Sequence, residues 1–129
     1  MDKDELKNKL TEEEYHVTQE KGTEAPFSGI YYKETAKGTY NCKVCGNPLF
    51  SSDTKYDSDT PGLAGWPSFD QSIPGSVEYI DDNSMGMHRM EVVCAKCKSH
   101  LGHIFDEAEA KTGKHYCINS CSLDLEKGE

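Results

Sequence analysis

The apolar residues of this chain follow two patterns, helix-like near the start and strand-like afterwards. Within residues 2–20, Thr11 precedes Glu14 by three positions, which is the form of a helix-capping box. The apolar side chains of this region stand among charged ones, at Leu6, Leu10, Tyr15 and Val17. We therefore expect two short helices here, with residues 1–16 forming a helical extension.

Two hairpins are predicted by short apolar runs on either side of turn-forming residues. The first covers residues 38–50 and holds a Cys-x-x-Cys pair in its turn. Gly46 directly follows that pair and suits a tight turn, because glycine tolerates a positive φ. The second hairpin pairs residues 77–80 with residues 87–93 and leads into another Cys-x-x-Cys pair.

Two further strands are expected after the second hairpin. One begins at Ile104 and Phe105, and the last covers residues 115–125. Residues 51–65 are rich in Asp, Ser, Thr, Pro and Gly, so we expect a long surface loop there. Residues 126–129 are expected to be a flexible tail. Short strands separated by turns, with helix only at the start, predict a mainly β fold.

Composition narrows this picture to one small domain over residues 1–129. Only 35% of the residues are hydrophobic and 11 are glycines, so the core is small for the chain and a bound metal would add needed stability. The net charge of -9 argues against a broad nucleic-acid surface and against binding to an acidic membrane. No apolar run resembles a signal peptide or a membrane span, which predicts a soluble cytoplasmic protein.

The strongest chemical signal is the two Cys-x-x-Cys pairs, formed by Cys42 with Cys45 and by Cys94 with Cys97. A gap of two residues lets both sulfurs of a pair face one ion, and two pairs complete the tetrahedral four-sulfur shell that zinc favours. Such a shell leaves no position for a substrate, so we expect one structural Zn²⁺ that joins two distant hairpins. A dithiol redox pair, a chance cluster or a set of disulfides are the alternatives.

Cys117 and Cys121 stand outside these pairs, and one of them is the natural candidate for a nucleophile. The alternative is that both simply fill the core, as free cysteines often do. On an unbroken strand, His115 and Asn119 share a face with Cys117 and make it polar. Cys121 lies four residues further on, roughly 13 Å along a strand. It can act as a resolving thiol only after a turn or local unravelling, because a disulfide needs Cα atoms within roughly 7 Å.

Three other side chains are candidates for the same site. His100 and His103 follow the second cysteine pair closely, and each can be a ligand of a second metal, an acid-base group or a structural hydrogen-bonding residue. A histidine titrates near neutral pH and can protonate a leaving oxygen. Trp66 lies between glycine and proline, where its ring suits the wall of a small apolar pocket, although it can equally be a core residue.

Long stretches of the sequence resemble the methionine-R-sulfoxide reductases of the B type. The matching motifs cover nearly everything from Val17 to Leu125, and they lie at residues 23–29 (TEAPFSG), 38–50, 65–69 (GWPSF), 91–105 and 113–123. The resemblance implies twisted antiparallel sheets arranged as a β-tent, with a four-cysteine zinc on the side away from the pocket. It also implies that oxidised proteins are the substrate, and we expect a monomer.

The resemblance assigns roles to individual residues. By position, Cys117 matches the family's catalytic cysteine and His103 its acid-base histidine. Further pocket residues by the same resemblance are His100, Asn119, Trp66, which receives the substrate's methyl group, and Phe105. His115 stands in the substrate-binding region where members usually carry arginine. Histidine supplies less positive charge there near neutral pH.

The chemistry of the reaction agrees with these roles, because a sulfoxide sulfur becomes electrophilic once its oxygen is protonated. We expect the Cys117 thiolate to attack this sulfur, His103 to protonate the oxygen, and Cys117 to become a sulfenic acid. Ala64 stands where many members carry a resolving cysteine, and Cys121 replaces the commoner alanine. Regeneration by a thioredoxin-like donor must then run through Cys121 or occur directly.

Two rival functions follow from the same residues. The first is a zinc-dependent interaction module that shares the fold and has lost catalysis. The second is a thiol-disulfide oxidoreductase that works through Cys117 and Cys121. The presence of Cys117, His103 and Trp66 together disfavours the first, because a binding module has no use for that set.

Overall fold

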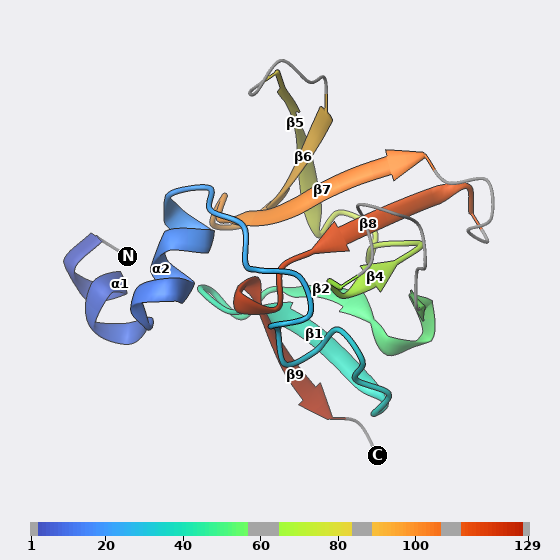
Figure 1. Cartoon of the computed structure of the whole chain (residues 1–129), viewed down its shortest axis with the longest axis horizontal. Helices are drawn as coiled ribbons and strands as arrows, with labels where there is room; N and C mark the ends of the chain where they lie inside the picture. Colours follow the sequence, from blue (N-terminus) through green and yellow to red (C-terminus); the bar gives the residue numbers. More distant parts are fainter. Residues whose placement is uncertain (1–2, 57–64, 84–88, 107–111, 128–129) are drawn as a thin grey trace.

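The computed structural model describes residues 3–56, 65–83, 89–106 and 112–127, and two short helices precede its strands (Figure 1). They are α1 (Lys3–Lys9) and α2 (Glu12–Gln19). The predicted capping box is confirmed, because Thr11 Oγ1 accepts from the Glu14 N–H at 3.1 Å and Glu14 Oε1 accepts from the Thr11 N–H at 2.9 Å.

The helices are packed into the protein, so residues 1–16 are more than an extension. Leu6 and Leu10 of this region belong to the hydrophobic core, and Val17 of α2 is 1% exposed. The extension was predicted because the region is highly charged, but Leu6 and Leu10 are buried and Tyr15 packs against the core. Residues 1–2 lie outside the described part of the chain.

The strands form two antiparallel sheets, which confirms the mainly β fold with short N-terminal helices (Figure 1). A three-stranded sheet has the order β2-β1-β9 and a six-stranded sheet the order β3-β4-β8-β7-β6-β5. The strands are β1 (Gly38–Cys42), β2 (Pro48–Ser51), β3 (Lys55–Tyr56), β4 (Ser68–Phe69), β5 (Val77–Asp82), β6 (Arg89–Cys94), β7 (His100–Asp106), β8 (Lys114–Ile118) and β9 (Leu123–Lys127).

Both predicted hairpins are present as β1 with β2 and β5 with β6. β5 extends through Asp82 into the expected turn. Residues 84–88, which include Met87, the expected start of the second strand, lie outside the described residues. The expected loop over residues 51–65 begins with a 3-10 helix, Ser52–Thr54, and with β3. Residues 57–64 of that loop, including Ala64, are also outside the described residues. Among the described residues, no helix is long and apolar enough to cross a membrane.

The expectation of one last strand over residues 115–125 is wrong. The chain leaves β8 after Ile118, forms a 3-10 helix over Ser120–Ser122, and re-enters the other sheet as β9. Polar bonds replace strand pairing at the break: the backbone N–H and the side-chain amide of Asn119 both donate to the Leu101 carbonyl oxygen, at 2.9 and 3.1 Å. The Ser122 hydroxyl donates to the His100 carbonyl oxygen at 2.8 Å.

The predicted tail is also shorter than expected. β9 continues through Glu126 and Lys127, which pair with Thr39 and Gly38 of β1. Asn41 Nδ2 donates to Glu126 Oε2 at 3.0 Å and fastens the same strand. Only residues 128–129 of the expected tail remain, and they lie outside the described residues.

An aromatic cluster joins the two sheets. Phe50 of the three-stranded sheet stacks on Phe69 of the six-stranded sheet with ring centroids 4.4 Å apart. Tyr40 meets Phe69 edge-on at 5.2 Å, and Tyr116 meets Phe50 edge-on at 5.5 Å. Tyr40, Phe50 and Phe69 have no exposed surface, so this cluster is the centre of the core.

Removing one ring of this cluster should destabilise the protein strongly. We expect Phe69→Ala to lower the free energy of unfolding by about 3–5 kcal/mol, because it deletes a fully buried ring and leaves a cavity between the sheets. Phe27→Ala is the matched control, since Phe27 is 61% exposed, and it should change that free energy by less than about 1 kcal/mol. Urea unfolding followed by fluorescence measures both, and equal losses would contradict the assignment of the core.

Candidate active site and metal centre

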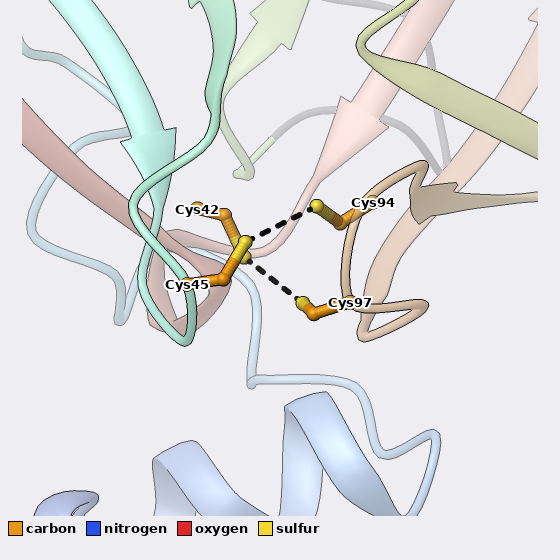
Figure 2. A group of neighbouring side chains, drawn as sticks. All are labelled: Cys42, Cys45, Cys94 and Cys97. Carbon is orange, nitrogen blue, oxygen red and sulfur yellow. Dashed lines mark hydrogen bonds between the residues drawn. The ribbon is translucent and has the colours of Figure 1, made fainter. Parts of the chain in front are cut away.

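Four cysteine side chains converge from the two hairpins, as Figure 2 shows. The Sγ atoms of Cys42, Cys45, Cys94 and Cys97 all lie within 4.8 Å of one another. Cys42 Sγ is 3.6 Å from Cys97 Sγ, and Cys45 Sγ is 3.6 Å from Cys94 Sγ. The four predicted ligands therefore form one cluster.

The spacing of the four sulfurs suits a metal ion. Four thiolates arranged tetrahedrally at about 2.3 Å from a zinc ion lie about 3.8 Å from one another, close to the observed 3.6 Å. A disulfide needs about 2.05 Å, so these contacts are not disulfides. Hydrogen bonds from Cys42 and Cys97 lower the pKa of Cys94, whereas hydrogen bonds raise the pKa of Cys42 and burial raises that of Cys45. Cys94 is therefore the member of the cluster that favours the thiolate form.

Each cysteine pair sits in a tight turn with the same backbone form. The residue after the second cysteine has a positive φ in both, 81° at Gly46 and 65° at Lys98. The Gly46 N–H donates to the Cys42 carbonyl oxygen and the Lys98 N–H to the Cys94 carbonyl oxygen, both at 2.8 Å. The expected role of Gly46 is confirmed, whereas the same conformation at Lys98 was not predicted.

The N-terminal helices fasten both cysteine turns. Lys9 Nζ donates to the Val44 carbonyl oxygen at 2.6 Å, inside the first turn. Gln19 Nε2 donates to Ser99 Oγ at 3.0 Å, and the same hydroxyl accepts from Cys97 Sγ at 3.1 Å. The cluster thus connects the helices, the first hairpin and the start of β7.

A separate pocket lies on the six-stranded sheet and brings five predicted site residues together. Its volume is about 80 Å³, which is room for a few non-hydrogen atoms, as at the end of one side chain. Cys117, His103, Asn119, Trp66 and Phe105 line it, and the other lining residues are Thr23, Arg89 and Gly102. A thiol, an imidazole and an indole therefore face one small cavity.

Strand register places the thiol beside the imidazole. Cys117 of β8 is paired directly with His103 of β7, and paired residues of antiparallel strands have Cβ atoms about 4.5–5.5 Å apart on the same face. Phe105 is two residues beyond His103 and shares that face. Gly102 allows the two strands to meet, since a Cβ there would be 2.1 Å from the Cys117 carbonyl oxygen.

His100 supports the pocket from behind and does not line it. In a regular strand, residues three apart point to opposite faces, but the register between β6 and β7 shifts at Val92 and Val93. This irregularity lets the rings of His100 and His103 meet at 5.6 Å. His100 Nδ1 donates to Glu91 Oε2 at 2.7 Å, and burial lowers the pKa of His100 despite that carboxylate.

His115 is also absent from the pocket lining, contrary to the expectation of a substrate-binding position. It is completely buried, with Nε2 2.8 Å from Ser68 Oγ and its ring 5.4 Å from the Tyr56 ring. The side chains of Ser68 on β4 and Tyr56 on β3 contact it, and His115 is not among the residues that line the pocket.

Cys121 lies outside the pocket as well, in the 3-10 helix that interrupts the predicted strand. Its backbone N–H donates to Glu24 Oε1 at 2.9 Å, and its thiol donates to Glu13 Oε1 of α2 at 3.4 Å. Burial and these two carboxylates raise the pKa of Cys121.

Glu24 is the central residue that the sequence did not single out. It is 3% exposed; its N–H donates to Asn119 Oδ1 at 3.1 Å, and its carbonyl oxygen accepts from Trp66 Nε1 at 2.9 Å. Together with the bond to Cys121, it orients three predicted residues. Its position in the family motif at residues 23–29 could have indicated a functional role. No local sequence pattern, however, indicates that its carboxylate is buried.

Burial, with Glu24 as the second cause, raises the pKa of Cys117 to about 12. Arg89 and Asp82 were also missed: Asp82 Oδ2 lies 2.8 Å from His103 Nε2 and 3.3 Å from Arg89 Nη2. Both stand on strands whose pattern gave no hint of chemistry. The site is thus a neutral thiol near an imidazole that contacts a carboxylate.

Comparison with known proteins shows the family of the chain. The model of the SelR domain matches residues 10–127. Two curated relatives are named peptide methionine sulfoxide reductase MsrB. The one from Methanosarcina barkeri is 52% identical over 127 residues, covering 98% of this chain and 87% of that protein. The one from Leptospira interrogans is 50% identical over 122 residues, covering 94% of this chain and 90% of that protein.

A third relative is longer than this chain. The mouse protein named methionine-R-sulfoxide reductase B3, mitochondrial, is 52% identical over 122 residues, which are 94% of this chain and 47% of that protein. This chain thus spans about half the length of the mouse relative. The matched domain and these identities show that the chain belongs to the SelR-domain family, the B-type methionine-R-sulfoxide reductases.

Proposed function

We propose that this enzyme reduces methionine-R-sulfoxide in proteins with Cys117 as the nucleophile and His103 as the proton carrier. Family membership makes the chain a methionine-R-sulfoxide reductase, and the roles of individual residues are our assignment. The observation that carries the assignment is the direct pairing of Cys117 with His103 at a pocket walled by Trp66 and Phe105. These rings suit the methyl group of the substrate.

The first step must begin from a thiol, because a pKa of about 12 leaves Cys117 protonated at neutral pH. His103 takes this proton and delivers it to the sulfoxide oxygen while the Cys117 sulfur attacks the sulfoxide sulfur. The substrate's sulfur–oxygen bond breaks and an oxygen remains on Cys117. The substrate sulfur gains two electrons, Cys117 loses two, and the products are methionine and a sulfenic acid.

We propose that an external thiol reduces this sulfenic acid directly. Two thiols of a thioredoxin-like donor then become a disulfide, and the oxygen leaves as water. The surroundings of Cys121 disfavour a route through that residue: it does not line the pocket, its thiol is bonded to Glu13, and Glu24 also raises its pKa. These features also disfavour a thiol-disulfide oxidoreductase that uses Cys117 with Cys121.

We propose that the four-cysteine cluster holds one Zn²⁺ with a structural role. Four sulfur donors at tetrahedral spacing fit zinc better than the hard cations, which prefer oxygen. Because the shell is closed, the ion would hold the two hairpins together and take no part in sulfoxide reduction. We also propose a monomer that works in the cytoplasm, where unpaired cysteines persist.

A pair of cysteine variants tests the nucleophile and the recycling route together. We expect Cys117→Ser to lose sulfoxide reduction by at least about 1000-fold, because the hydroxyl is a far weaker nucleophile at neutral pH. Cys121→Ser is the control and should keep at least half of the parent rate with dithiothreitol or thioredoxin. Release of methionine from the R epimer measures both. Inactive Cys121→Ser would refute direct recycling, and active Cys117→Ser would refute the assigned nucleophile.

The raised pKa of Cys117 predicts how its reactivity depends on pH. Below its pKa, the thiolate fraction of a thiol rises about tenfold for each pH unit. Alkylation of Cys117 by iodoacetamide should therefore become about tenfold faster per pH unit from pH 7 to 10. The Cys121→Ser variant isolates this reaction, and mass spectrometry locates the label. A rate that levels off by pH 9 would show that Cys117 titrates like an ordinary cysteine.

Metal content tests the cysteine cluster. We expect the purified protein to hold one zinc per chain, and Cys94→Ser to lose it together with the cooperative unfolding transition. Structural zinc contributes on the order of 10 kcal/mol, as much as the whole stability of a typical domain. Cys121→Ser removes a cysteine outside the cluster and should keep the zinc. Full zinc in Cys94→Ser, or none in the parent, would contradict the proposal.

A further inference from the structure

A carboxylate and a guanidinium surround the imidazole that the proposed reaction needs. Asp82 is the last residue of β5 and Arg89 the first of β6, and the two are paired in register. Asp82 Oδ2 lies 3.3 Å from Arg89 Nη2 and 2.8 Å from His103 Nε2. One carboxylate oxygen therefore contacts both the guanidinium and the imidazole. The His103 side chain is 13% exposed, that of Asp82 20% and that of Arg89 24%, so water screens these contacts only partly.

We propose that Asp82, held by Arg89, is a positioning residue that fixes the tautomer and orientation of His103. This inference rests on the proposed function of His103. A carboxylate can only accept a hydrogen bond, so Nε2 of His103 carries the hydrogen. The other nitrogen, Nδ1, then keeps its lone pair and is the atom that receives the proton of Cys117. The triad logic of thiol and hydroxyl nucleophiles applies: base, nucleophile and a carboxylate that orients the base.

The carboxylate also stabilises the charged state that follows. Once His103 has taken the thiol proton it is an imidazolium, and Asp82 at 2.8 Å lowers the free energy of that cation. This help matters here because the Cys117 thiol is buried and beside Glu24, so its proton does not leave readily. Arg89 lines the pocket next to this pair, and its positive charge balances that of Asp82 while His103 is neutral.

Other charged groups near His103 are engaged elsewhere. Glu91 is opposite His103 on β6, but its Oε2 accepts from His100 Nδ1 at 2.7 Å and its Oε1 meets Lys21 Nζ at 3.2 Å. The His100 ring lies 5.6 Å from that of His103. On the side of β8, Glu24 acts on Cys117. Among the residues that the structure describes, Asp82 is the carboxylate bonded to His103.

The test replaces Asp82 with a side chain of the same shape. Asp82→Asn should lower kcat by about 100-fold, the usual contribution of a positioned acid-base group, while KM changes less than about threefold. Asp81→Asn is the matched control, since Asp81 is exposed and its side chain points to the opposite face of the sheet from that of Asp82. It should match the parent.

A second readout does not depend on turnover. Nitrogen-15 spectra of histidine-labelled protein, with the His103 signals assigned through His103→Gln, should show hydrogen on Nε2 in the parent and a shift toward Nδ1 in Asp82→Asn. Hydrogen on Nδ1 in the parent, or a kcat of Asp82→Asn that matches that of Asp81→Asn, would overturn the positioning role. If the parent shows the Nε2 tautomer yet Cys117→Ser retains turnover, the positioning holds and the proposed nucleophile fails.

Discussion

The pairing of β7 with β8 is the constraint on which the rest of the site depends. It sets Cys117 directly opposite His103, and it is possible only because Gly102 leaves room for the Cys117 carbonyl oxygen. At its far end, both donors of Asn119 bind the Leu101 carbonyl oxygen and end the strand there. A slip of one residue would turn the thiol to the other face of the sheet. The chemistry is therefore a property of strand register as much as of residue type.

The cysteine cluster secures that register from a distance. Cys94 is the last residue of β6 and His100 the first of β7, so the second cysteine turn is the connection between these strands. A metal held there would fix where β7 begins relative to the first hairpin, and the helix α2 adds the Gln19 bond to Ser99. The pocket is formed on the pair β7 and β8, whereas the cysteine cluster lies at the end of the pair β6 and β7. A small, glycine-rich core gains from such a restraint.

What the sequence could predict follows from how local each signal is. The cysteine cluster was found because two Cys-x-x-Cys pairs carry their own geometry, and the helices because Thr11 and Glu14 form a complete cap within four residues. The break at Asn119 was missed because its cause, the Leu101 carbonyl, lies 18 residues away in the chain. Strand alternation and the family resemblance placed His115 at the pocket, but its side chain is buried against Ser68 and Tyr56, and no local pattern predicts those contacts. Glu24 and Asp82 could not be identified from the sequence, because their partners are distant in the chain and are brought close only by the fold.

The buried, protonated state of Cys117 fits a reductase that must avoid side reactions. A permanent thiolate at an open pocket reacts with peroxide and other oxidants. It is then oxidised to sulfenic, sulfinic and sulfonic acids without reducing any methionine sulfoxide. Sulfoxide reduction differs from those reactions because the substrate oxygen itself needs a proton. Under the proposed mechanism, Cys117 keeps its proton until His103 can pass that proton to the sulfoxide oxygen, so the thiol is activated only when the substrate is bound. Burial and the Glu24 carboxylate keep the resting thiol protonated and slow its reaction with other oxidants. The pocket, with its imidazole and aromatic walls, thus favours reaction with a sulfoxide.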